Sequence, residues 1–553
     1  MILNGSEILV SVLLEQGVDR VFGYPGGSVL NIYDALYKNS DKITHYMTAH
    51  EQGAAHAADG YARSTGKTGV VIATSGPGAT NLVTGIATAY MDSVPMVAIT
   101  GNVPTPLIGA DSFQEVYITG ITMPITKHNF VVRKVEELAD ILREAFRIAE
   151  SGRPGPVLVD IPKDVTAAKT TYTYKEKDNT PIRTDKIVGN LNEIAELINR
   201  AERPFIYFGG GVRLSEASDE LRTFIQKADI PAAYTLMAAG VLGYGERHNL
   251  GLMGMHGNFS ANAAANRADV MLAIGTRFSD RVALNTSKFG HNSKIVHIDI
   301  DPAEINKNIT ADYSIVGDVK AVLNKLIPKI KETKRDAWFD KINEWKKDDY
   351  IPEASKTELK PNFIIETACK AAGEDAIFVT DVGQHQMWAA QFIHHTKPRN
   401  FLTSGGLGTM GYGYGAAIGA KVANPDKPVV HFTSDGSLHM NMNELCTAVS
   451  YGLPVITVIL NNAVLGMVRQ WQGAFYDRRF SSSEPERVTD YAKVAEAFGA
   501  KGYHCETPAE FEAAMSEAVK ADGPVWIECV IDREEKVLPM IPSGGTVHDT
   551  IFK

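Results

Sequence analysis

The chain contains little cysteine. Its 553 residues include four, Cys369, Cys446, Cys505 and Cys529, and no two are close enough in sequence to suggest a zinc site or a redox pair. We therefore expect small buried thiols in a reducing compartment, not metal ligands or disulfides.

Long hydrophobic runs and an excess of positive charge are also missing. Residues 1–6 contain no basic group, and apolar runs such as 454–460 are too short to cross a bilayer. The formal net charge is -10, whereas a nucleic-acid surface needs a positive field. These absences predict a cytoplasmic protein that contacts neither membranes nor nucleic acid. A small anionic substrate stays compatible, because it needs only a few local positive groups.

The distribution of apolar residues predicts several domains of one class. A chain of this length is too long for a single core, and short apolar runs alternate with longer amphipathic stretches, which is typical of parallel α/β sheets. We expect three doubly wound parallel-sheet domains at 1–167, 186–345 and 361–553, joined first by a surface linker over 168–185. The expected strands include 70–73, 96–99, 157–162, 205–208, 270–274, 295–298, 429–432 and 455–460.

Two polar motifs follow neighbouring predicted strands near the C-terminal end. Ser434-Asp435-Gly436-Ser437 follows one strand and Asn461-Asn462 follows the next, so both lie at the carboxyl edge of a parallel sheet, where α/β proteins bind ligands. Asp435, Asn462 and the backbone carbonyl of Val464 offer the oxygen ligands that Mg²⁺ prefers. Gly436 and Ser437 offer backbone N–H groups to a phosphate. Taken alone, each of these two motifs is more often an ordinary turn or loop.

A glutamate and two glycine-rich motifs stand out in the first segment. Glu51 begins an alanine-rich stretch, and such a residue is usually a first-turn group stabilised by the helix dipole. Here Gly23-Tyr24-Pro25-Gly26-Gly27-Ser28 precedes it, and residues 74–81, Thr-Ser-Gly-Pro-Gly-Ala-Thr-Asn, follow it.

Together these motifs resemble those of thiamine-diphosphate enzymes. The resemblance implies that Glu51 hydrogen-bonds the cofactor's pyrimidine ring and activates it. It also implies that Met410 wedges the cofactor into its bent form and that Gly27 presents a backbone N–H nearby. The residues implied to contact thiamine diphosphate are Pro25, Glu51, Thr74, Gly78, Asn81, Val382, Gly383, Gln384, His385, Gly408, Met410, Gly436 and Ser437.

Further segments resemble the catalytic subunits of acetohydroxyacid (acetolactate) synthases. These segments are 112–115, 125–129, 381–388, 465–471 and 537–545. The resemblance implies decarboxylation of pyruvate and its condensation with pyruvate or 2-ketobutyrate, giving acetolactate or acetohydroxybutyrate for branched-chain amino-acid biosynthesis. Residues 539–546 are expected to form a lid that excludes water.

The same resemblance suggests which side chains meet the substrates. Trp471 and Met467 lie in the segment that selects the second keto acid, where contact with one added methylene is worth about 1–3 kcal/mol. Arg281 and Lys163 are expected to attract a carboxylate, although most charged residues form surface ion pairs. Gln114 is expected to hydrogen-bond a substrate, with Phe113 and Ser28 beside it.

A glycine run in the middle segment suggests a nucleotide site. Gly209-Gly210-Gly211 follows a predicted strand, which alone is a weak signal. The resemblance implies FAD, bound but not consumed in the net reaction. The implied contacts are Arg153, Gly209, Gly210, Gly211, Thr235, Leu236, Met237, Met255, His256, Gly275, Arg277, Arg281, Asp299, Ile300, Asp318 and Val319.

Several positions depart from the family pattern. Ser434 stands where glycine is usual and would be strained if that position required a positive φ. Ser28 replaces alanine, Ser279 replaces aspartate, Tyr414-Gly415 replaces Leu-Pro, and Ala463-Val464 replaces a polar-histidine pair.

The departures leave two alternatives. One is another thiamine-diphosphate decarboxylase or oxidase, and the other is a homologue that binds cofactor without catalysis. The family's sites form between subunits, which implies a homodimer or homotetramer. The sequence leaves open whether a regulatory small subunit also binds.

Overall fold

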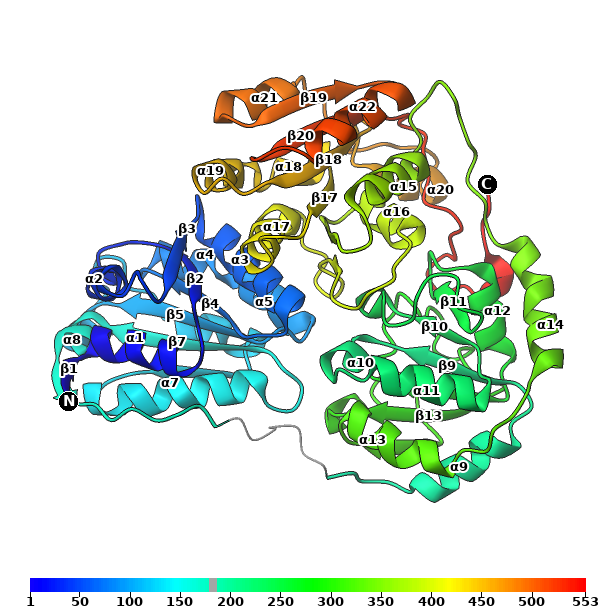
Figure 1. The fold of residues 1–553 in the computed structure, drawn as a ribbon, viewed down its shortest axis with the longest axis horizontal. Helices are drawn as coiled ribbons and strands as arrows, with labels where there is room; N and C mark the ends of the chain where they lie inside the picture. Colours follow the sequence, from blue (N-terminus) through cyan, green and yellow to red (C-terminus); the bar gives the residue numbers. More distant parts are fainter. Residues whose placement is uncertain (179–185) are drawn as a thin grey trace.

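The computed structural model describes residues 1–178 and 186–553, and it contains three six-stranded sheets in which every neighbouring pair of strands is parallel (Figure 1). The predicted α/β class is therefore confirmed. Each predicted strand lies within an observed one. Strands β5 and β7 are buried along their whole length, because helices cover both faces of a parallel sheet and only apolar runs suit that position.

The first sheet has the order β3-β2-β4-β5-β7-β6. Its strands are β2 (Arg20–Tyr24), β3 (Thr44–Met47), β4 (Gly69–Ala73), β5 (Met96–Asn102), β6 (His128–Val131) and β7 (Pro156–Pro162). The helices of this part of the chain are α1 (Gly5–Glu15), α2 (Leu30–Lys38), α3 (Glu51–Thr65), α4 (Pro77–Asn81), α5 (Val83–Met91), α6 (Ile118–Thr122), α7 (Val135–Glu150) and α8 (Lys163–Ala167).

The second sheet has the order β11-β10-β9-β12-β13-β14. Its strands are β9 (Pro204–Phe208), β10 (Ala232–Tyr234), β11 (Asn249–Leu252), β12 (Val270–Ile274), β13 (Lys294–Asp299) and β14 (Tyr313–Val316). The helices are α9 (Leu191–Arg200), α10 (Gly210–Leu214), α11 (Ser218–Ala228), α12 (Phe259–Arg267), α13 (Val319–Leu326) and α14 (Asp336–Trp345).

The third sheet has the order β16-β15-β17-β18-β20-β19. Its strands are β15 (Ile377–Thr380), β16 (Phe401–Leu402), β17 (Val429–Ser434), β18 (Val455–Asn461), β19 (Lys501–Cys505) and β20 (Val525–Val530). The helices are α15 (Pro361–Ala372), α16 (Gln384–Phe392), α17 (Tyr412–Ala423), α18 (Asp435–Leu438), α19 (Leu445–Ser450), α20 (Gly466–Phe475), α21 (Tyr491–Phe498) and α22 (Pro508–Ala518).

Each sheet has an interior point where the strand order reverses. These switch points lie between β2 and β4, between β9 and β12, and between β15 and β17. Ligands of open α/β sheets bind outside the carboxyl ends of the strands at such points. The predicted thiamine-diphosphate and nucleotide motifs lie at the carboxyl ends of these strands.

The prediction of a linker over 168–185 is wrong at its first residues. Strand β8 (Lys169–Thr171) pairs antiparallel with β1 (Ile2–Asn4), and Tyr172 is buried in the first core. Among the described residues of this segment, only the short strand β8 pairs with another strand. The rest of the predicted linker includes 179–185, which lie outside the described residues.

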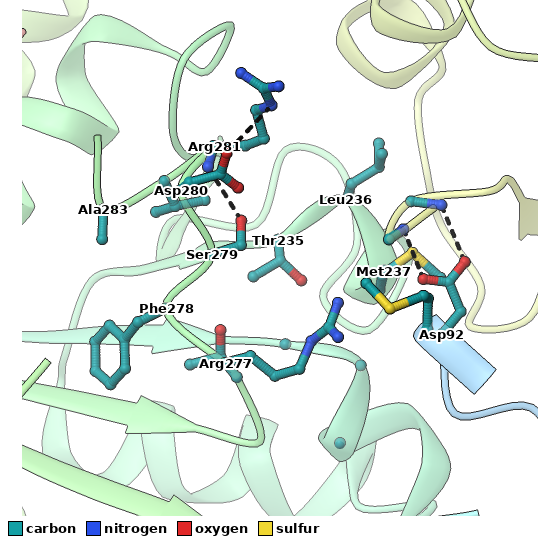
Figure 2. A pocket seen from close by; sticks show the side chains of 18 of the residues that line it. Asp92, Thr235, Leu236, Met237, Arg277, Phe278, Ser279, Asp280, Arg281 and Ala283 are labelled. Carbon is teal, nitrogen blue, oxygen red and sulfur yellow. Dashed lines mark hydrogen bonds and ion pairs between the residues drawn. The ribbon is translucent and has the colours of Figure 1, made fainter. Parts of the chain in front are cut away.

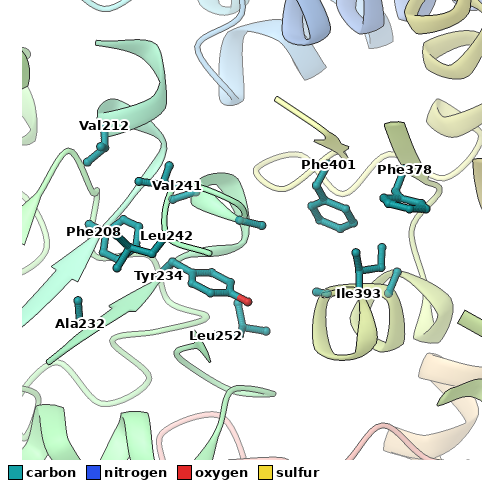
Figure 3. Close-up of a cluster of buried hydrophobic side chains, with 14 of the residues drawn as sticks. Phe208, Val212, Ala232, Tyr234, Val241, Leu242, Leu252, Phe378, Ile393 and Phe401 are labelled. Carbon is teal, nitrogen blue, oxygen red and sulfur yellow. The ribbon is translucent and has the colours of Figure 1, made fainter. Parts of the chain in front are cut away.

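The three sheets pack into one body through buried contacts. Helices α3 and α17 cross closely because small residues meet there: a Cβ added to Gly419 would lie 1.8 Å from the carbonyl oxygen of Ala57. One apolar cluster joins the second sheet to the third and includes Phe208, Tyr234, Ile393 and Phe401 (Figure 3). Within the described ranges, no helix is both long and apolar enough to cross a membrane.

Candidate functional site

A cavity of about 1380 Å³ lies at the carboxyl ends of the second sheet's strands. Every residue predicted to contact a flavin lines it, together with Asp92, Arg213 and Glu304. Figure 2 shows Arg277 extending between Thr235 and Met237, while Phe278 points away from them. The cavity exceeds the roughly 300–1,000 Å³ of common small-molecule pockets, so its size suits a dinucleotide.

The glycine run is explained by backbone packing. A Cβ on Gly211 would lie 2.6 Å from the Cα of Gly275, which itself has φ +58°. Any side chain would separate the turn after β9 from the turn after β12. These glycines are therefore required by the switch point whether or not a phosphate lies against them.

Other groups on the cavity wall already have partners. Arg153 donates to Glu304 at 2.7 Å, and Asp318 accepts from Ser215 Oγ at 2.6 Å and caps α13. Ser279 Oγ accepts from the backbone N–H of Arg281 at 3.3 Å and so helps to shape this turn. Two buried atoms on the wall have no hydrogen-bond partner among the described residues, Glu304 Oε2 and Arg213 Nε. They mark polar sites that fit a polar ligand.

Glu51 is the first residue of α3, as the sequence indicates. Its side chain is 8% exposed, and Asn81 Nδ2 donates to its Oε2 at 2.9 Å. The turn before it is held from the third domain, because Glu444 accepts the backbone N–H groups of Ala49 and His50 at 3.1 and 3.0 Å. Glu51 is therefore positioned by Asn81 of the first domain and, through the turn before it, by Glu444 of the third domain.

Thr74, Gly78 and Ser28 surround the same carboxylate region. A Cβ on Gly78 would lie 3.2 Å from Glu51 Oε1 and 2.7 Å from the Thr74 methyl group. Ser28 Oγ lies 2.9 Å from Thr74 Oγ1 and accepts from the Ser75 N–H at 3.0 Å. The Ser28 hydroxyl, which stands where the family usually has alanine, is therefore hydrogen-bonded to Thr74 and Ser75 within the first domain.

Asp435 and Asn462 follow neighbouring strands in matching register. Ser434 pairs with Leu460 across β17 and β18, so the residues beyond them lie side by side. Asp435 is 2% exposed, its Oδ1 has no hydrogen-bond partner among the described residues, and burial raises its pKa to about 6. An unpaired buried carboxylate oxygen on a strand end that adjoins the Asn461-Asn462 end of the next strand fits a hard divalent cation.

This oxygen-rich set holds only one acidic residue. Accordingly, no group of three or more His, Cys, Asp or Glu side chains with metal-binding geometry occurs in the part of the chain that the structure describes. Asn462 is held by Gln384, whose Oε1 accepts from Asn462 Nδ2 at 3.0 Å.

Ser434 fits its position without strain. Its φ is -130°, and its Oγ accepts from the Ser437 N–H at 3.4 Å as the N-cap of α18. The position therefore does not need glycine. Met410 lies over this turn, since a Cβ on Gly436 would be 3.9 Å from its Cε. His385 Nε2 is buried and has no partner among the described residues.

The predicted substrate residues divide into two groups. Arg281, Met467 and Trp471 line the cavity beside Val382, Gly383 and Gly408. Phe113 is 89% exposed, Gln114 has φ +60° and packs on Gly76, and Lys163 begins α8; none of the three lines the cavity. No hydrogen bond or ion pair among the described residues joins Glu51 and Asn81 to Asp435 and Asn462.

Sequence reasoning missed a buried ion-pair network beside the site. Asp92 accepts from Arg63 Nη2 at 2.9 Å and from the N–H groups of Gly405 and Gly406 at 3.0 and 2.7 Å (Figure 2). It ties the first domain to the loop that leads to Met410. A lone Asp after a helix gives no sequence signal for this role.

The predicted C-terminal lid lies against the second domain. The N–H of Ile541 donates to the Met255 carbonyl at 2.8 Å, and the N–H of Gly544 donates to the Leu284 carbonyl at 3.2 Å. Ser543 and Gly544 line the cavity. The segment is therefore placed to close one side of it.

The chain matches three family models along its length. They are the N-terminal TPP binding domain of thiamine pyrophosphate enzymes over residues 3–121, the central domain over 191–326, and the C-terminal TPP binding domain over 381–529. These matches cover most of the three sheets.

Curated relatives match over nearly the full length. The chain is 44% identical to the acetolactate synthase large subunit of Buchnera aphidicola subsp. Acyrthosiphon pisum, covering 99% of this chain and 98% of the relative. It is 46% identical to the acetolactate synthase of Mycobacterium bovis, covering 99% and 91%, and 43% identical to the isozyme 3 large subunit of Escherichia coli, covering 99% and 98%.

Proposed function

The chain belongs to the acetolactate synthase large subunits of the thiamine pyrophosphate enzymes, and from this premise we propose that it condenses pyruvate with a second 2-keto acid. The second substrate is pyruvate or 2-ketobutyrate, and the products are acetolactate or acetohydroxybutyrate. The observation that carries the proposal is the unpaired, buried Oδ1 of Asp435 beside Asn462, an arrangement suited to Mg²⁺ and a diphosphate.

Each half of the proposed site has its own task. Thiamine diphosphate, when bound, supplies the carbon centre at which a 2-keto acid loses carbon dioxide. Asp435, Asn462 and the Val464 carbonyl would hold Mg²⁺, which would help to neutralise the diphosphate. Glu51, oriented by Asn81, would hydrogen-bond the pyrimidine ring of the cofactor, and Met410 would pack against the cofactor.

The cavity side receives the acceptor. Trp471 and Met467 provide an apolar wall, and Arg281 provides a positive charge for the acceptor's carboxylate. Residues 539–546 exclude water, which would otherwise protonate the reacting carbon. FAD occupies the large cavity without being consumed.

The proposal includes assembly. Glu51 and Asp435 serve different sites in one chain, so a second copy supplies the missing half in a homodimer or homotetramer. The domain limits 1–167, 186–345 and 361–553 and a cytoplasmic location belong to the same proposal. Because the relatives are named large subunits, a regulatory small subunit is the expected further partner.

Product analysis tests the proposal. Purified protein is incubated with pyruvate, Mg²⁺ and thiamine diphosphate, with and without FAD, and acetolactate and acetaldehyde are both measured. Acetolactate that requires FAD is expected. Acetaldehyde as the main product, or reduced flavin, would instead favour another decarboxylase or oxidase of the family. Failure to bind Mg²⁺ and thiamine diphosphate would favour a non-catalytic homologue.

A further inference from the structure

Arg213 is a buried charge that lacks a protein partner. It lies on α10, two residues after Gly211, and is 5% exposed. Among residues 1–178 and 186–553 it makes no ion pair and no side-chain hydrogen bond, and its Nε is buried and unpaired. Leaving a guanidinium in this state is costly, since buried charges are normally paired.

The acidic groups near Arg213 are already engaged. Asp59 and Asp92 both bind Arg63, and Asp92 also accepts two backbone N–H groups. Burial, together with the positive charges of Arg399 and Arg63, lowers the pKa of Arg213 to about 9. The surroundings thus desolvate Arg213 and repel its charge, while the carboxylate of Asp92, which attracts it, is already bonded to Arg63 and to two backbone N–H groups.

Arg213 lines the cavity, and its position suggests what supplies the missing charge. It shares one wall with the turn after β9, at the switch point of the second sheet. Glu304 bonds Arg153 and Asp318 bonds Ser215, and among the described residues no carboxylate of this wall forms an ion pair with Arg213. The cavity of about 1380 Å³ is far larger than a keto acid requires.

We propose that Arg213 is the anchor for a phosphate group of the dinucleotide held in this cavity. This inference rests on the proposed function, which places FAD there, and adds a residue that the sequence did not indicate. Arg213 would donate charge-assisted hydrogen bonds to phosphate oxygens. The folded protein therefore carries an unfavourable charge that the ligand neutralises, and ligand binding should stabilise the protein more than contact area alone would.

The test compares Arg213→Met with wild type after removal of flavin. Affinities for FAD, ADP and riboflavin are measured by fluorescence or calorimetry, and the melting temperature Tm is measured with and without FAD. We expect Arg213→Met to weaken FAD and ADP binding about tenfold or more, the effect of a lost charge-assisted bond. Riboflavin, which has no phosphate, should bind both proteins equally. Without ligand, the variant should be at least as stable as wild type.

The control is Arg143→Met, far from the cavity. Arg143 is bidentate to the buried Glu15, so its loss should lower Tm without changing FAD affinity. Equal weakening of riboflavin and FAD, an unchanged FAD affinity, or a lower Tm of ligand-free Arg213→Met would overturn the inference, the last because it reveals a structural partner.

The outcomes also separate the two proposals. If wild type binds ADP through Arg213 but does not bind FAD, the phosphate site stands and the flavin assignment fails. If pyruvate is bound through Arg213 and ADP is not, or if wild type binds none of these anions, the phosphate site itself is wrong.

Discussion

At the residue scale, the position of Glu51 was predictable and its support was not. The sequence placed a glutamate at a helix start, where dipole stabilisation is the usual explanation. The hydrogen bond from Asn81 joins residues far apart in the chain, and the pair from Glu444 to the preceding turn comes from another domain. Such long-range partners leave no local pattern.

Glu51→Gln tests the role proposed for Glu51 directly. We expect kcat for acetolactate to fall by about 10²–10⁴-fold, the usual contribution of a positioned acid or base, with an unchanged Tm. Glu510→Gln is the matched control, because Glu510 is also a first-turn glutamate, in the capping box of α22. Steady-state kinetics that show Glu51→Gln within twofold of wild type would remove Glu51 from the chemistry.

Asp160 predicts a pH dependence of stability. It is 2% exposed, and burial raises its pKa to about 7 although Thr100 and Asn102 donate to it. The folded pKa lies above the unfolded value of about 3.9. The folded state therefore binds the proton more tightly, and this stabilisation is complete below about pH 4 and lost as the pH rises to about 7.

The measurement compares the Tm of wild type and Asp160→Asn between pH 5 and 8. The free energy of unfolding of wild type, relative to the variant, should fall by about 1.4 kcal/mol per pH unit up to about pH 7 and then level off. Parallel Tm curves over this range would mean that Asp160 does not titrate as its burial suggests.

At the scale of elements, the strands could be predicted and their contacts could not. Runs such as 96–99 and 455–460 are apolar because both faces of their sheets are covered. Strand β8 escaped prediction because it is a short polar edge. The Gly415 departure is explained only by the fold, since a Cβ there would lie 2.8 Å from the carbonyl oxygen of Gly53 across α3 and α17.

The network around Asp92 gives a prediction at this scale. Asp92 and Arg63 have side chains that are 0% and 1% exposed, and removing one partner of a buried pair costs about 3–5 kcal/mol. Asp92→Asn should lower Tm and also kcat, because the loop that leads to Met410 loses its anchor. Asp34→Asn breaks the exposed pair with Lys38 and should change neither, since such pairs contribute about 0–1 kcal/mol. Equal Tm values for the two variants would contradict the anchoring role.

At the scale of the whole molecule, sequence and structure identify the same three binding edges. Cofactor motifs were predictable because they are local and follow strands. The assembly of the site was not, because it depends on how copies of the chain meet. Within one copy, Glu51 is bonded to Asn81 and Asn462 to Gln384, and no hydrogen bond among the described residues joins Glu51 to Asp435. The proposed assembly brings these two groups together from two copies of the chain.

Complementation between inactive variants tests this assembly most directly. Glu51→Gln and Asp435→Asn are co-expressed with different tags, mixed oligomers are purified, and acetolactate formation is measured. If sites form between copies, each variant alone is inactive, and the purified mixed dimers regain about half of wild-type activity, because each holds one intact site out of two. A mixture as inactive as its components would contradict a shared site, and activity in either variant alone would contradict the chemistry assigned to it.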